Sequence, residues 1–262
     1  MSSSANSRIE PPTPTVDRAS GVSLSIVTWN VQWATPRSWR APHLLNRIDR
    51  HAPDVICLTE THRDLLTQPG HRICSWPYTG YPRIQGRRKV MLWSRRPWRE
   101  VDDLGIDTFP PGRFVSGVTL TPLGDVMVMG ICIPWFGSRT EAWRGDKRKR
   151  RWEDHERYLD GLREVLRRIP REGVIVIGDF NQIVGSASRA PVKLRRALQE
   201  AFPPGLRIVT SDIAFEGRAS IDHITLGADL AATSVSPLSN LREGKKLSDH
   251  FGIAARVFQT WG

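Results

Sequence analysis

The chain of 262 residues has few cysteines and no long apolar run. Its three cysteines form no Cys-x-x-Cys pair, and an odd number argues against a disulfide framework as well as a cysteine zinc site. The longest apolar runs have the length of a strand, far short of the roughly 18 to 20 residues that a membrane-spanning helix needs. The N-terminus lacks the apolar stretch of a secretory signal. We therefore expect a cytoplasmic protein with no membrane span.

The composition is that of a globular protein with excess positive charge. Apolar residues make up 39% and charged residues 25%, which excludes wholesale disorder, collagen and a coiled coil. The 38 lysines and arginines outnumber the 27 aspartates and glutamates, which gives a formal net charge of +11. Such a balance favours a polyanionic partner, either nucleic acid or an anionic membrane surface.

The composition changes once along the chain. Residues 1–20 are rich in Ser, Pro and Thr and have almost no apolar side chains, so we expect a disordered N-terminal tail. From there to the end, segments typical of strands and helices alternate without an internal repeat. This pattern predicts one domain over residues 21–262.

Short alternating or wholly apolar runs predict strands, and apolar stripes at helical spacing predict helices. The predicted strands are Val22–Trp29, Asp54–Leu58, Val90–Trp93, Phe114–Leu120, Val126–Ile133, Val174–Ile177, Ile221–Leu226 and Gly252–Phe258. The predicted helices are Pro42–Arg50, Trp152–Ile169 and Val192–Ala201.

Polar side chains gather where five of these strands begin or end. They are Asn30, Glu60, Asp179 with Asn181, Asp222 with His223, and Asp249 with His250. Taken singly, each has an ordinary interpretation as a cap, a turn or a solvated loop residue. Five such positions together are harder to dismiss, because carboxylate, amide and imidazole are the groups that metal ions and phosphate chemistry require.

The order of these motifs resembles the endonuclease/exonuclease/phosphatase superfamily, which includes deoxyribonuclease I, abasic-site endonucleases of the exonuclease III type, sphingomyelinases and inositol phosphatases. The matching segments are TWN at 28–30, LTE at 58–60, GDFN at 178–181, IDHI at 221–224 and SDH at 248–250. GDFN after a buried strand, combined with a terminal SDH, is the most specific part. The resemblance implies an α/β (α+β) fold, a four-layer α/β/β/α sandwich in which two packed mixed sheets are flanked by helices. It also implies a site at one end of the sheets.

The resemblance further implies a metal site. Glu60 resembles the principal ligand of a divalent cation, which is magnesium in most members, with manganese as the alternative. Asn30 and Asp249 resemble residues that help to hold the metal and its waters. Oxygen ligands of this kind suit a hard cation.

The same resemblance implies roles around the phosphate. His250 resembles the histidine beside the scissile phosphate, and Asp222 the acid that hydrogen-bonds it and favours the imidazolium. Asn181 resembles a donor of hydrogen bonds to phosphate oxygens. The base that activates water is either Asp179 or the pair of His250 and Asp222.

Cys132 departs from the pattern of the nuclease members, many of which place a His or Tyr at the equivalent strand end. A neutral thiol is a poor hydrogen-bond partner for phosphate and a poor acid for a leaving alkoxide. The two-histidine mechanism of deoxyribonuclease I therefore does not transfer directly. The candidates to substitute are His43, His62, an arginine, or water held by the metal.

Two basic segments, Lys147–Arg151 and Arg83–Arg99, are candidates for contact with a phosphate backbone. Five consecutive cations repel one another, which favours a role in binding for Lys147–Arg151. The alternative is a solvated helix face with intrahelical pairs such as Glu153 with Arg157, and scattered solubilising charge in the second segment.

Together these features predict a magnesium-dependent hydrolase of phosphoester bonds, an endo- or exonuclease acting on DNA or RNA. A second hypothesis keeps the chemistry but takes a lipid or small phosphate ester as substrate, because Cys132 replaces the usual acid. A third is a non-catalytic member that binds nucleic acid through its basic surface.

Overall fold

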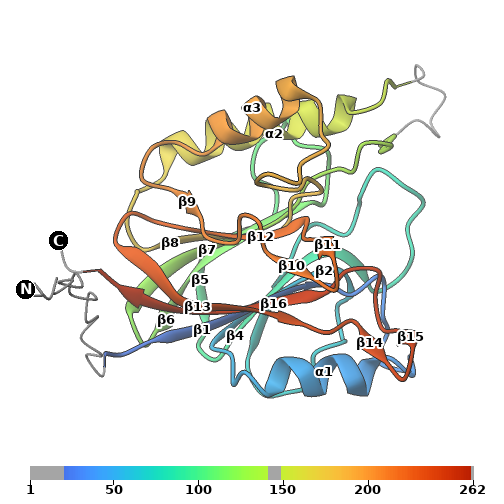
Figure 1. Ribbon diagram of the computed structural model, residues 1–262, viewed down its shortest axis with the longest axis vertical. Helices are drawn as coiled ribbons and strands as arrows, with labels where there is room; N and C mark the ends of the chain where they lie inside the picture. Colours follow the sequence, from blue (N-terminus) through green and yellow to red (C-terminus); the bar gives the residue numbers. More distant parts are fainter. Residues whose placement is uncertain (1–20, 141–148, 261–262) are drawn as a thin grey trace, which may run out of the picture.

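The computed structural model describes residues 21–140 and 149–260, and two six-stranded sheets packed face to face form its centre (Figure 1). The predicted tail, residues 1–20, lies outside the described residues. The first sheet contains β1 (Leu24–Asn30), β2 (Val55–His62), β3 (His71–Cys74), β4 (Arg87–Ser94), β13 (Leu230–Leu238) and β16 (Gly252–Gln259). Its order is β13-β16-β1-β2-β4-β3.

The second sheet has the order β5-β6-β7-β8-β12-β9. Its strands are β5 (Trp98–Asp102), β6 (Phe114–Thr121), β7 (Gly124–Cys132), β8 (Val174–Asp179), β9 (Arg207–Ile208) and β12 (Asp222–Leu226). Two short hairpins lie outside the sheets, one formed by β10 (Ala214–Phe215) and β11 (Arg218–Ala219), the other by β14 (Leu241–Arg242) and β15 (Lys245–Lys246).

Helices cover the outer face of each sheet. Figure 1 shows α1 (Ala41–Asp49) against the first sheet, and α2 (Glu153–Arg168) with α3 (Val192–Ala201) against the second. The expected four-layer α/β/β/α sandwich is therefore confirmed.

Three apolar clusters hold these layers together: one between the sheets, one under α1 and one under α2 and α3. The two faces of β8 belong to two of these clusters. Ile175 and Ile177 point into the cluster between the sheets, while Val174 and Val176 point towards the helices. Since both faces are covered, an uninterrupted apolar run forms this strand.

All eleven predicted helices and strands are present, with shifted ends in most cases. The largest shift is in β2, which continues to His62 where the predicted strand stops at Leu58, because its polar end pairs with β4. Eight of the described strands were not predicted: seven of only two to five residues, and the longer β13. It is a half-exposed edge strand that contains Pro237, so it lacks a clear alternation, and an edge is where a sheet tolerates proline.

The topology brings the polar strand ends to one end of the sandwich. β1 and β2 run parallel, as do β7 and β8, so the carboxyl ends of each pair lie together. β12 is antiparallel to β8 and begins with Asp222 opposite Asp179. β16 is antiparallel to β1, which brings the segment before Gly252 next to the end of β1.

Gly130 marks a point where the sheets approach closely, which gives a test of this packing. A Cβ atom on Gly130 would lie 2.6 Å from Cγ1 of Val90 in the opposite sheet. We expect Gly130→Ala to lower the free energy of unfolding by about 1–3 kcal/mol, measured by urea denaturation. Val90→Ala removes the contacted methyl, so the double variant should lose less stability than the sum of the single variants. Strict additivity would contradict this account.

Candidate active site

Two buried carboxylates form the centre of the candidate site. Asp179 at the end of β8 and Asp222 at the start of β12 are cross-strand partners, and each is 1% exposed. Alternate side chains of a strand share a face. Asp179 is two residues from Ile177 and Asp222 two residues from Ile224, and both isoleucines point into the space between the sheets. The two acids therefore face the same way, beyond the last apolar layer.

Asp179 accepts hydrogen bonds from both sheets. Asn30, at the end of β1, donates through Nδ2 to Oδ2 over 2.9 Å, and the backbone N–H of Asn181 donates to Oδ1 over 2.8 Å. Asn181 has a φ of +51°, a left-handed conformation that asparagine tolerates well. Its side chain donates to the carbonyl oxygen of Ile133 over 2.8 Å, so the loops after β7 and β8 are joined.

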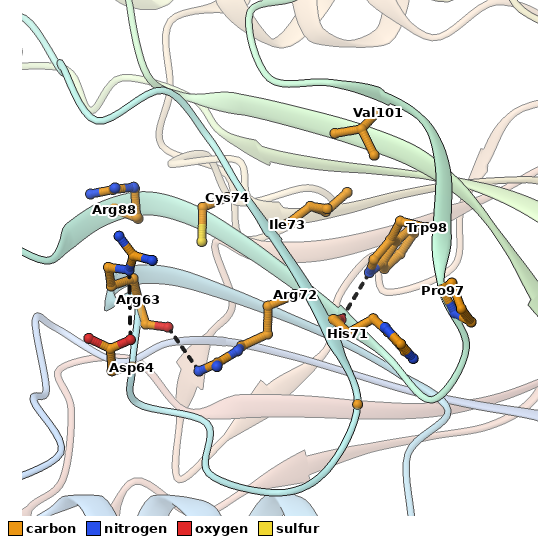
Figure 2. Close-up of a pocket in the computed structure, with 11 residues that line it drawn as sticks. Arg63, Asp64, His71, Arg72, Ile73, Cys74, Arg88, Pro97, Trp98 and Val101 are labelled. Carbon is orange, nitrogen blue, oxygen red and sulfur yellow. Dashed lines mark hydrogen bonds and ion pairs between the residues drawn. The ribbon is translucent and has the colours of Figure 1, made fainter.

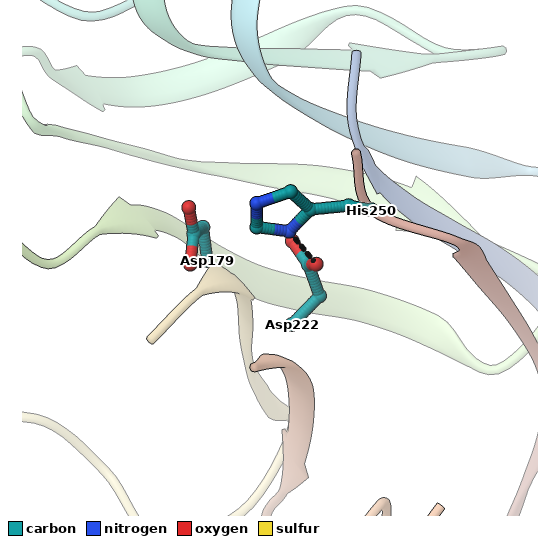
Figure 3. A group of neighbouring side chains, drawn as sticks. All are labelled: Asp179, Asp222 and His250. Atoms are coloured by element: carbon teal, nitrogen blue, oxygen red, sulfur yellow. Dashed lines mark hydrogen bonds and ion pairs between the residues drawn. The ribbon is translucent and has the colours of Figure 1, made fainter. Parts of the chain in front are cut away.

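His250 completes the cluster (Figure 3). Its Nδ1 lies 2.6 Å from Oδ2 of Asp222, and the ring is directed towards Asp179. Ligand atoms of the three residues all lie within 4.8 Å of one another. Oδ1 of Asp222 is buried and has no hydrogen-bond partner among the described residues. An unpartnered carboxylate oxygen of this kind is suited to a cation, a water or a phosphate hydroxyl.

The close charges shift two pKa values in this cluster. Burial, helped by the charge of Asp222, raises the pKa of Asp179 to about 7, although His250 and Asn30 act to lower it. Burial alone would lower the pKa of His250, but the charge and hydrogen bond of Asp222 outweigh it and raise this pKa to about 10. The arrangement thus favours an imidazolium next to the buried acids.

Glu60 lies close enough for its charge to raise the pKa of Asp179 further. It is in β2, between Thr59 and Thr61, which pair with Val90 and Arg88 of β4, and it has a φ of +45°. Its Oε1 forms an ion pair of 2.6 Å with Nζ of Lys89, with side chains 24% and 10% exposed. Lys89 was not predicted as a site residue, because in the sequence it is one cation of a basic run.

The residues predicted to bind a metal offer the oxygen atoms that a hard divalent cation prefers. The Glu60 carboxylate already holds a cation, the ammonium of Lys89, which indicates a place where positive charge is stabilised. Oδ1 of Asn30 accepts the backbone N–H of Gln32 over 3.0 Å. Asp249 is half exposed, with Oδ1 4.0 Å from Nε2 of His250. The donor set fits such a cation.

An arginine, and neither proposed histidine, lies beside Cys132. His43 contacts Arg242 near α1, and Nδ1 of His62 lies 3.8 Å from Oδ2 of Asp64. Arg113 is 2% exposed, and its Nη1 lies 3.4 Å from the carbonyl oxygen and 3.9 Å from Sγ of Cys132. Its other two guanidinium nitrogens have no partner among the described residues.

Asp222, Asp179 and Cys132 lie side by side on neighbouring strands of the second sheet, and Arg113 is the next residue along this row. Cys132 is the cross-strand partner of Asp179, and the backbone N–H of Cys132 donates to the carbonyl oxygen of Arg113. Burial raises the pKa of the Cys132 thiol to about 12, so the thiol stays neutral. In the sequence, Arg113 follows Pro-Pro-Gly and has the pattern of a loop arginine, so only the strand pairing reveals its position.

The two basic segments have different surroundings along their lengths. In the second, Arg87 lies at the site end of β4, whereas Arg95 and Arg99 lie beyond its other end and pair with Asp54 and Asp125. In the first, residues 147 and 148 lie outside the described residues. Lys149 pairs with the buried Asp154, Arg150 is exposed near Glu153, and Arg151 stacks on Phe136.

A cavity of about 580 Å³ lies between the edge strands β3 and β5 (Figure 2). Arg63, Arg72 and Arg88 line it, and Trp98 donates a hydrogen bond of 3.0 Å to the carbonyl oxygen of His71 at its rim. The cavity contains none of the predicted site residues.

Comparison with known proteins identifies a family. The model of the endonuclease/exonuclease/phosphatase family matches residues 27–250. No curated protein matches the chain.

In the described part of the chain, no helix combines the length and apolar character needed to span a membrane.

Several solved structures share the fold. A 3'-5' exonuclease from Neisseria meningitidis, NExo, is 18% identical with a TM-score of 0.64, over 91% of this chain and 100% of that one. TDP2 from D. rerio, complexed with a single-strand DNA product, is 15% identical with a TM-score of 0.61, over 90% and 99%. An AP endonuclease from Archaeoglobus fulgidus is 17% identical with a TM-score of 0.61, over 88% and 98%.

His223, on the opposite face of β12 from the acids, gives a pH-dependent test. Its Nδ1 accepts the Thr210 hydroxyl, its Nε2 donates to the carbonyl oxygen of Gln182, and burial lowers its pKa from 6.5 to about 4. The fold thus favours the neutral ring, so this stabilisation is complete above pH 6.5 and is lost as the pH falls towards 4. The full effect is about 3 kcal/mol.

The measurement is the difference in unfolding free energy between the native protein and His223→Gln as a function of pH. The raised pKa of Asp179 acts in the opposite direction in the same range, and the subtraction removes it. We expect the native protein to lose its advantage over the variant as the pH falls from 6.5 to 4. A difference that does not change with pH would contradict the assignment.

Proposed function

Since the chain belongs to the endonuclease/exonuclease/phosphatase family, we propose that it is a metal-dependent phosphodiester hydrolase, an endo- or exonuclease acting on DNA or RNA. The observation that carries this proposal is the convergence of Asp179, Asp222 and His250 with Asn30 and Glu60 at one end of the two sheets. These side chains come from five separate strands or strand ends. A shared role in binding a metal ion and a phosphate would account for the burial of two acids side by side.

Glu60, with Asn30 and Asp249, is the proposed set of metal ligands, for magnesium or alternatively manganese. When bound, the ion would supply a Lewis acid that stabilises negative charge on the phosphate and the leaving oxygen. Lys89 is adjacent to this set, and its ammonium would then be shared with or displaced from Glu60.

The remaining residues have distinct proposed roles around the phosphate. His250 is bound through Nδ1 to Asp222, which leaves Nε2–H to donate to a phosphate oxygen. Asp179 is then the carboxylate that takes a proton from the attacking water. Asn181 uses one side-chain N–H for Ile133 and keeps the other for a phosphate oxygen as charge develops.

Nucleic acid is the proposed substrate because the chain is positively charged and because its fold is similar to that of proteins that act on DNA. The chain carries a net charge of +11, and Arg87 and Lys89 lie at the site end of β4. Structures of the same fold include an AP endonuclease, a 3'-5' exonuclease and TDP2 with single-strand DNA. We propose a cytoplasmic location for this activity, as the three free cysteines suggest.

The substrate is tested by incubating the purified protein with single-stranded, duplex and abasic DNA and with RNA, with and without EDTA. We expect cleavage that EDTA abolishes, and a loss on the order of 100-fold or more in Asp179→Asn, since that variant removes the base but keeps the side-chain shape. Higher activity on sphingomyelin, inositol phosphates or nucleotides would instead favour a lipid or small phosphate ester. Absence of any metal-dependent cleavage would remove the nuclease function.

The metal site is tested by calorimetry with Mg²⁺ and Mn²⁺. We expect Glu60→Gln to weaken binding, because an amide replaces the charged ligand. Lys89→Met should strengthen binding by on the order of tenfold, because it removes the cation that competes for Glu60. Equal affinities in all three proteins would place the metal elsewhere.

A further inference from the structure

A second cavity, of about 380 Å³, opens beside Glu60. Its lining includes Trp33, Tyr81, Arg83, Ile84, Arg87 and Lys89. We call it the Trp33 pocket. It shares Lys89 with the candidate site, because the ammonium of Lys89 also forms the ion pair with Glu60. A ligand in this pocket would therefore lie next to a phosphate bound at the catalytic cluster.

The lining of the Trp33 pocket combines positive charge with flat apolar surfaces. Arg83, Arg87 and Lys89 contribute cations, and none of the described residues that line the pocket is acidic. The guanidinium carbon of Arg87 lies 4.7 Å and Nζ of Lys89 4.9 Å from the centroid of the Trp33 ring. A ligand that matches this surface has an anionic group and a planar group close together.

Hydrogen bonds hold the walls of the pocket in place relative to the site. Trp33 has a φ of +59°, and its backbone N–H donates to the carbonyl oxygen of Glu60. On the other wall, the hydroxyl of Tyr81 lies 3.2 Å from Oγ of Ser138 and accepts the backbone N–H of Arg139. The pocket is thus connected both to a proposed metal ligand and to the loop that follows β7.

We propose that the Trp33 pocket binds an unpaired nucleotide next to the phosphodiester that is cleaved. This inference rests on the proposed function. The base stacks on the Trp33 ring in place of the Arg87 guanidinium and packs against Ile84, while Arg87 and Lys89 contact its phosphate. The cavity has the size of a small-molecule site, and a base within a duplex is covered on both faces by its neighbours. The pocket therefore selects single-stranded segments or frayed ends.

Binding is measured without cleavage, by fluorescence anisotropy of a labelled single-stranded oligonucleotide with the Asp179→Asn protein in EDTA. In this background we expect Trp33→Ala to weaken binding by on the order of tenfold, and Trp33→Phe to retain most of the affinity because it keeps an aromatic face. Arg87→Met should weaken binding and lower the slope of log affinity against log salt by about one.

Two matched variants serve as controls. Trp39 is 52% exposed and lies outside the pocket, so Trp39→Ala should bind as the parent protein does. Arg96 is exposed beyond the opposite end of β4, so Arg96→Met should change binding less than Arg87→Met. The affinity for a duplex of the same sequence should change little in Trp33→Ala.

The outcomes separate this inference from the proposed function. Unchanged oligonucleotide affinity in Trp33→Ala and Arg87→Met overturns the pocket, whatever the cleavage assays give. Equal losses for single strand and duplex overturn the preference for an unpaired nucleotide. A nucleoside monophosphate should displace the oligonucleotide better than inorganic phosphate does in the protein that retains Trp33, but not in Trp33→Ala. Equal displacement by the two compounds in both proteins overturns the role of the base. Loss of cleavage in Asp179→Asn tests the proposed function alone.

Discussion

The buried hydrogen bond from Asn30 to Asp179 crosses from one sheet to the other, and the geometry of the site depends on it. A buried carboxylate next to a second one is unfavourable unless hydrogen bonds and opposite charge compensate it. Asp179 receives that compensation from Asn30, the N–H of Asn181 and the nearby His250. All of this requires a fixed distance between the sheets, which the apolar cluster between them provides. One contact thus links the packing of the sheets to the geometry of the proposed active site.

Charge balance at the site follows from the same constraint. A phosphodiester brought to Asp179, Asp222 and Glu60 meets like charge, so binding requires cations nearby. The chain places His250, Lys89 and Arg113 near these acids, from strands and strand ends of both sheets. A divalent cation held by Glu60 would add to them, which is why the acid-rich site and the basic surface belong to one proposed function rather than to two.

Sequence alone predicts the layers well and the site in part. Asp179 and Asn181 follow a wholly apolar strand, a local pattern that is visible without any structure. Lys89 and Arg113 were missed, because their positions depend on strand pairing between distant segments, and a cation near a strand end looks like any solvated one. β13 was missed for a related reason, since a half-exposed edge strand with a proline has no clear period.

The neighbourhood of Cys132 limits the chemistry that the site can perform. The thiol is neutral, and its neighbour Arg113 carries a permanent charge that can stabilise an anion but cannot give up a proton. In the proposed reaction, the acid for the leaving oxygen is therefore His250 or solvent, while Asp179 accepts the proton of the attacking water. Asp222 acts on both groups, because its bond to Nδ1 favours the protonated form of His250 and its charge raises the pKa of Asp179, which makes that carboxylate a stronger proton acceptor.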